Sequence, residues 1–125
     1  MIRAVALVII QSAALAGDMP YGWEHCRALY ADQDHSSCVA YVVEECASAS
    51  SKSSCIEGLA NDWRAYDVNL RLMEASRKSD LKALADASFA SSALLRDAAA
   101  SCDDDVQCHL VHAIENALMQ HAASE

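Results

Sequence analysis

The sequence predicts an all-α fold, a small disulfide-stapled helical bundle with a long antiparallel helical hairpin. Residues that break helices are scarce, because the 125 residues include three Gly and one Pro, and Gly58 is the only one of these after residue 23. Alanine and other strong helix formers fill the remainder. The six cysteines are an even number, as expected for a small core held by disulfides.

Residues 1–16 have the pattern of a secretory signal peptide. A basic residue, Arg3, precedes an apolar run that ends in Ala14-Leu15-Ala16, with small residues at positions −3 and −1 of a cleavage site. Cleavage there leaves residues 17–125 as a single Cys-rich helical domain of about 109 residues. The apolar run is shorter than the roughly 20 residues that span a bilayer. We therefore expect a periplasmic or secreted protein without a membrane anchor.

The composition is acidic. Nine Lys and Arg residues stand against 18 Asp and Glu residues, which gives a net charge of −9, and loss of Arg3 with the signal peptide makes it −10. Such a domain repels phosphate backbones, so nucleic acid is not an expected partner. It would attract a basic protein. Net charge also keeps exported proteins in solution without any partner.

All six cysteines follow the signal peptide, so three disulfides are expected in an oxidising compartment. They are Cys26, Cys38, Cys46, Cys55, Cys102 and Cys108. The last two share one turn and should pair with each other. The other four allow Cys26–Cys46 with Cys38–Cys55, or Cys26–Cys38 with Cys46–Cys55. No Cys-x-x-Cys spacing is present, so a zinc site is not expected.

Five helices are predicted, over about 24–32, 37–47, 54–78, 79–101 and 103 onward. Ser54-Cys55-Ile56-Glu57 fits a capping box at the start of the third helix. The apolar residues of that helix recur at intervals of three and four, which places them on one face. They are Ile56, Leu59, Trp63, Tyr66, Leu70 and Met73.

The fourth helix should start at a cap formed by Ser79 with Asp80, run unbroken to about Ser101, and form the long hairpin with the third. The two short Cys-rich helices should pack at one end of this hairpin. Asp103-Asp104-Asp105 suits the positive end of the last helix. The buried face of that helix is predicted as Leu110, Val111, Ile114 and Leu118.

Three residues on the last helix have the spacing of metal ligands. His109, His112 and Glu115 follow one another at intervals of three, but only Asp105 offers itself as a further ligand. A solvated helix face explains them better, and the aspartate run lacks the pattern of a calcium loop. We expect no metal and no cofactor.

No catalytic signature is present. The chain has neither a Gly-x-Ser-x-Gly motif nor a Gly-rich phosphate loop, and oxidised cysteines leave no thiolate nucleophile. The sequence therefore predicts a protein that is not an enzyme. Tyr21 and Trp23 precede the first helix, where packing on a neighbour is favoured over contact with a partner, although both residue types are frequent in binding hot spots.

The order of cysteines and motifs gives a further indication. Three cysteines lead into Cys55 and Glu57, and the helix that follows carries Tyr66-Asp67-Val68-Asn69-Leu70. Arg96-Asp97 then precedes Cys102 and Cys108. In this layout the chain resembles the LprI-type lysozyme inhibitor family, small exported bacterial proteins rich in cysteine. Arg71 and Glu74 depart from the pattern, where the family has Asn and Tyr.

The resemblance implies an exported protein-binding domain that blocks a basic lysozyme in the periplasm, or that binds another cationic envelope protein. Its motif residues here are Tyr66, Asp67, Leu70, Arg96 and Asp97. Two other functions stay open: an envelope protein of a different role, and a carrier of small apolar ligands.

Overall fold

The computed structural model describes residues 19–124, and within them it has six helices and no strand, which confirms the all-α fold. The predicted signal peptide and its cleavage site lie outside the described residues. The helices are α2 (Trp23–Tyr30), α3 (His35–Glu44), α4 (Lys52–Arg77), α5 (Leu81–Ser88), α6 (Ala90–Cys102) and α7 (Val106–Ser124). None of these helices is both long enough and apolar enough to cross a membrane.

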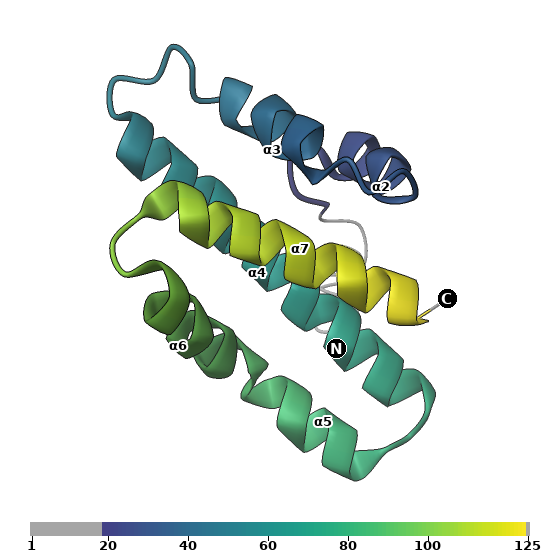
Figure 1. Ribbon diagram of the computed structural model, residues 1–125. Helices are drawn as coiled ribbons and strands as arrows, with labels where there is room; N and C mark the ends of the chain where they lie inside the picture. Colours follow the sequence, from purple (N-terminus) through teal and green to yellow (C-terminus); the bar gives the residue numbers. More distant parts are fainter. Residues whose placement is uncertain (1–18, 125) are drawn as a thin grey trace, which may run out of the picture.

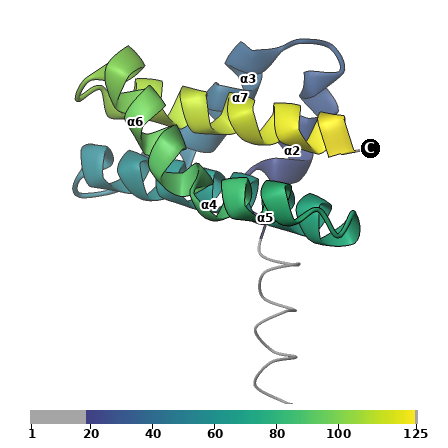
Figure 2. The ribbon, with the colours of Figure 1, turned by 90° about the horizontal axis from the view of Figure 1, so that it is seen from below.

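The two longest helices, α4 and α7, form the centre of the bundle and run in the same direction (Figure 1). They can do so because α5 and α6 carry the chain back between them. The α2–α3 pair covers one side of this centre and the α5–α6 segment covers the other (Figure 1). Seen from below, α5 lies beside α4, and α6 rises from there toward α7 (Figure 2).

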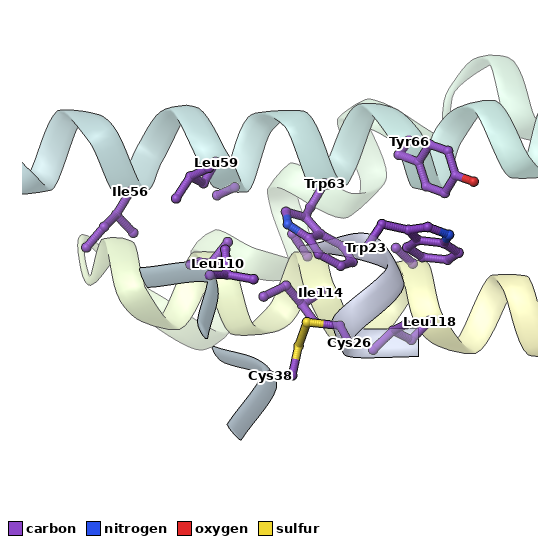
Figure 3. Packing of buried hydrophobic residues seen from close by; sticks show 14 of the residues in the cluster. Trp23, Cys26, Cys38, Ile56, Leu59, Trp63, Tyr66, Leu110, Ile114 and Leu118 are labelled. Atoms are coloured by element: carbon purple, nitrogen blue, oxygen red, sulfur yellow. A yellow bond between two sulfur atoms is a disulfide. The ribbon is translucent and has the colours of Figure 1, made fainter. Parts of the chain in front are cut away.

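The core forms where the apolar faces of α4 and α7 meet (Figure 3). Its largest members on these two helices are Ile56, Leu59, Trp63, Tyr66, Leu110, Ile114 and Leu118. Burial of each aliphatic side chain contributes about 1.5–3 kcal/mol, so this seam is the main source of stability. The predicted stripe is therefore confirmed for its first four residues on α4 and for three of the four residues on α7, where Val111 is only partly buried.

The stripe is wrong at its far end, because Met73 is 50% exposed while Ala75 is buried. The last turns of α4 are covered by α5, whose Ala83 and Ala87 approach the side that carries Arg71 and Ala75. A different partner helix thus selects a different face of α4.

The position of α2 and α3 also differs from the prediction. They lie along the α4–α7 pair, and Trp23 joins the same buried cluster as Trp63 and Ile114. The Trp23 ring lies 5.8 Å from that of Trp63 and 4.7 Å from that of Tyr66. Because this large side chain must be buried among other aromatics, the short helices are held on the side of the bundle.

The disulfides are Cys26–Cys38, Cys46–Cys55 and Cys102–Cys108. The third confirms the predicted pairing, and the first two decide between the alternatives. Cys26–Cys38 joins α2 to α3, and Cys46–Cys55 joins the end of α3 to the first turn of α4. Each closes a loop of 6 to 12 residues, worth about 2–3 kcal/mol in the chain-entropy model.

The start of α4 lies one turn earlier than the predicted capping box. Ser51 is the cap, with an extended backbone, and its hydroxyl oxygen accepts a hydrogen bond from the Ser54 amide at 3.3 Å. Ser54 is therefore inside the helix. Several serines precede the apolar stripe, so composition alone does not select which of them caps the helix.

The predicted fourth helix is divided at Phe89 into α5 and α6. Asp80 caps its start as predicted, since its carboxylate accepts a hydrogen bond from the Ala83 amide at 3.0 Å, whereas Ser79 lies before the cap with a positive φ of 54°. At the end of α5 the Ser88 hydroxyl donates a hydrogen bond to the Leu84 carbonyl at 2.8 Å, a contact that tends to bend helices. The returning leg of the hairpin is thus two helices, the first against α4 and the second leaning toward α7.

Of the three aspartates predicted at the start of the last helix, one caps α7. The Asp105 carboxylate accepts hydrogen bonds from the amides of Gln107 and Cys108, both at 3.1 Å. Asp103 and Asp104 precede this cap and are exposed.

Candidate functional site

The residues of the family motif are not gathered in one place. Tyr66 is buried against Trp23, and Leu70 packs against the core. Arg96 and Asp97 lie on the exposed side of α6. The α4 part of the motif is therefore part of the core, and it does not combine with the α6 part into a site.

Asp67 is the most deeply buried charged group in the described chain, with none of its surface exposed. The Arg71 guanidinium, one turn later on α4, donates to both of its carboxylate oxygens, at 3.0 and 3.5 Å. Desolvation raises the pKa of Asp67 above its ordinary value, although Arg71 and the more distant His112 act in the opposite direction. The pair joins two successive turns of α4, with Asp67 buried and Arg71 partly exposed.

The three residues with metal-ligand spacing are separately engaged. The His109 ring lies 2.7 Å from the Asp103 carbonyl oxygen, and the His112 ring pairs with the Asn116 amide at 3.1 Å. Glu115 pairs with His35 of α3 at 3.2 Å. Between residues 19 and 124 no three His, Cys, Asp or Glu side chains are grouped to hold a metal ion.

An exposed group of aromatic and acidic side chains lies on α2 and α3 and on the turn before them. We call it the tyrosine surface and define it as Tyr21, His25, Tyr41, Glu44 and Glu45, all of which are exposed. The His25 and Tyr41 rings stack at 4.0 Å and the Tyr41 and Tyr21 rings at 5.6 Å, with interplanar angles of 18° and 10°. Three nearly parallel rings thus reach solvent together.

The turn before α2 positions this surface. The Trp23 amide donates to the Pro20 carbonyl at 3.1 Å, and the buried Trp63 indole donates to the Tyr21 carbonyl at 3.2 Å. Gly22 has a positive φ of 85°, and a Cβ there would lie 2.8 Å from Cγ2 of Val42. Only glycine allows both this backbone and this close approach, so Tyr21 turns outward while Trp23 turns into the core.

The electrostatics of the surface favour a neutral Tyr21 ring beside negative charges. The pKa of Tyr21 is raised, first by its hydrogen bond to Tyr41, then by desolvation and by the charges of Tyr41, Glu45 and Glu44. Tyr21 therefore remains a neutral phenol at neutral pH. Aromatic faces attract the cations of Lys and Arg, and adjacent carboxylates add direct ion pairs.

Sequence reasoning identified Tyr21 and missed the other members. A usable signal was present, because Tyr41, Glu44 and Glu45 are spaced at i, i+3 and i+4 and must share one face of a helix. Nothing local indicates that Tyr21, 20 residues earlier, lies on the same face.

Comparison with known proteins finds no matching family model, no matching curated protein and no matching solved structure. The fold and the surface define the class of protein: an all-α, disulfide-bonded chain that presents stacked aromatic rings and carboxylates to solvent.

Proposed function

We propose that the chain is an exported protein-binding domain that docks on a cationic protein through the tyrosine surface. The observation that carries this proposal is the exposed stack of His25, Tyr41 and Tyr21 beside Glu44 and Glu45. Tyrosine contributes large contact area at low cost in side-chain entropy, and it is enriched among residues that dominate binding energy.

The rest of the molecule supports this function. The net charge of −9 accelerates encounter with a basic protein and leaves the choice of contact to local chemistry. Three disulfides suit an oxidising compartment such as the periplasm. The buried indole of Trp63 and the turn at Gly22 hold the rings in position before a partner arrives, which lowers the cost of binding.

A basic lysozyme is the specific target that we propose, on the strength of the resemblance to the LprI-type inhibitors. The test titrates the oxidised chain, residues 17–125, against a panel of basic lysozymes at low and moderate salt and reads both binding and lysis of cell walls. We expect binding that weakens as salt rises, together with loss of lysis. Binding without loss of lysis would leave a partner-binding role and reject inhibition. No binding to any lysozyme would reject the target.

Variants place the contact. Tyr41→Ala removes the central ring of the stack and should weaken binding by about 2 kcal/mol, roughly 30-fold. The double variant Glu44→Gln with Glu45→Gln should lose more affinity for the partner at low salt than at high salt, because salt screens the ion pairs that it removes. The matched control is Asp86→Asn with Asp97→Asn, which changes net charge equally at exposed positions of α5 and α6, the helices on the other side of the α4–α7 pair from α2 and α3 (Figure 1). If the control pair weakens binding as much as the glutamate pair, the tyrosine surface is not the contact.

A further inference from the structure

A second feature, apart from the tyrosine surface, is a hollow beside α4 at the turn between α6 and α7. Its volume is about 440 Å³, and it shares no residue with the tyrosine surface. Its lining combines a basic group, carboxylates and apolar side chains. The members used below are Glu57, Arg64, Leu95, Asp103, Asp104 and Val106.

Arg64 carries the basic group and is only 6% exposed. One guanidinium N–H donates to the side-chain oxygen of Asn61 at 2.9 Å. Among residues 19–124 no carboxylate lies within ion-pair distance of Arg64. Burial lowers its pKa without an opposing acidic group, so the protein bears the cost of a desolvated charge that it does not neutralise.

The guanidinium of Arg64 has more hydrogen-bond donors than the one that Asn61 uses. No fully buried side-chain nitrogen or oxygen in the described chain lacks a partner, so those that bond nothing must reach solvent, and Arg64 lines this hollow. An arginine presents a planar fork that fits a carboxylate with two parallel hydrogen bonds.

The turn between α6 and α7 forms another part of the wall and carries two aspartates that the fold does not use. Asp105 alone caps α7, whereas no other side chain in the described residues engages the carboxylates of Asp103 and Asp104. The wall is held in place by the Cys102–Cys108 disulfide and by the contact of His109 with the Asp103 carbonyl. Two free carboxylates on a fixed loop attract an ammonium and repel a bare anion.

We propose that this hollow binds a free α-amino acid with an apolar side chain. Arg64 takes the carboxylate, Asp103 and Asp104 with Glu57 take the ammonium, and Leu95 with Val106 contact the side chain. A free amino acid fits better than a peptide end, because a peptide's first residue lacks the free carboxylate and its last residue lacks the free ammonium.

Three matched probes test the proposal by calorimetry and by NMR of the arginine side chains of the oxidised chain. L-leucine carries both charges, 4-methylpentanoate lacks the ammonium, and 3-methylbutylamine lacks the carboxylate. We expect leucine to bind at least about tenfold more tightly than either analogue and to shift the Arg64 resonance. Equal binding of all three, or no binding of leucine at 10 mM or so, would overturn the proposal. Glycyl-leucine, in which the two charges are separated, should bind about as weakly as 4-methylpentanoate, and tight binding would assign the site to a peptide instead.

Variants separate the two charged walls. Asp103→Asn with Asp104→Asn changes only exposed groups, and it should reduce leucine affinity about tenfold while the affinity for 4-methylpentanoate does not fall. Arg64→Gln should weaken leucine and 4-methylpentanoate alike, with folding checked by circular dichroism. Arg77→Gln is the control, since it removes the same charge about 20 Å further along α4. An unchanged leucine affinity in the aspartate variant, which keeps the core intact, would refute the assignment even if Arg64→Gln failed to fold.

Discussion

Gly22 shows how one residue can determine both a core and a surface. Its positive φ reverses the chain between Tyr21, which is exposed, and Trp23, which is buried. Two neighbouring aromatics with similar propensities are thereby given opposite roles. The helix expected from the sequence starts after both residues, at about residue 24, whereas in the structure Trp23 is the first residue of α2 and is buried with Cys26 one turn later.

Gly22→Ala should destabilise the protein by about 1–3 kcal/mol, since an alanine there adopts a strained backbone and meets Val42. Denaturant unfolding measures the change. Gly58→Ala is the matched control: Gly58 is exposed inside α4 with no atom near the added Cβ, so the variant should gain up to about 1 kcal/mol. An unchanged stability of Gly22→Ala would show that the turn relaxes at no cost.

Asp67 makes a second residue-scale prediction, on pH. Because burial raises its pKa in the folded state, the folded protein takes up this proton at a higher pH than the unfolded chain does. The contribution of Asp67 to stability therefore improves as pH falls through the raised pKa toward the ordinary value of 3.8, and it is least favourable at neutral pH.

The measurement compares the wild type with Asp67→Asn from pH 7 to pH 4. The wild type should gain stability relative to the variant as pH falls. Glu74 and Asp34, whose pKa values are lowered by hydrogen bonds to Arg77 and to Ser37, lose stability over the acid range, but they do so in both proteins and cancel in the difference. A difference that is flat, or that falls with falling pH, would contradict the raised pKa of Asp67.

At the scale of elements, helix starts depend on which polar residue is geometrically free to cap. Asp80 and Asp105 follow the local pattern, whereas the predicted box at Ser54 gives way to Ser51. Ser51 has the extended backbone of a cap, and its hydroxyl oxygen accepts the hydrogen bond from the Ser54 amide, so residues 52–54 already belong to α4.

Ser51→Ala should therefore cost about 1 kcal/mol, the usual loss on removing a cap, whereas Ser54→Ala should leave stability unchanged or raise it by a few tenths of a kcal/mol, because position 54 lies inside the helix and alanine has the higher helix propensity. Thermal or denaturant unfolding of the two variants gives the comparison directly. A larger loss of stability in Ser54→Ala than in Ser51→Ala would support the predicted capping box at Ser54.

The break at Phe89 is also a property of an element rather than of a residue. The segment from 81 to 102 contains no Gly or Pro, and a single helix is its natural prediction. The break occurs because α5 packs on α4 while α6 packs mainly on α7. A single straight helix over these residues could not make both contacts.

At the scale of the whole molecule, stability rests on one continuous core that joins α2 and α3 to the α4–α7 pair. Trp23 is the link, in contact with the rings of Trp63, Tyr66 and His121. Residues from both ends of the described chain thus meet in one cluster, and we expect the domain to unfold as a unit.

Trp23→Ala should cost about 3–5 kcal/mol and should also remove partner binding, because α2 loses the anchor that positions Tyr21. Tyr21→Ala is the matched control, since it removes an exposed ring and should leave stability nearly unchanged. Unfolding followed separately by tryptophan fluorescence and by far-ultraviolet circular dichroism should give coincident transitions for the wild type. Separate transitions would mean that α2 and α3 fold independently of α4 and α7.

The sequence by itself determined the all-α fold, the pairing of Cys102 with Cys108, the caps at Asp80 and Asp105, and most of the seam between α4 and α7. These features follow from propensity, periodicity and short spacing, which act within a few turns of the chain.

Only the tertiary structure decided the pairing of the first four cysteines, the side position of α2 and α3, the break at Phe89, and the meeting of Tyr21 with Tyr41. The hollow at Arg64 belongs with them, since α4, α6 and the turn before α7 each supply part of its lining. All of these depend on contacts between segments distant in the chain, where the shared core selects one arrangement among several that local forces allow equally.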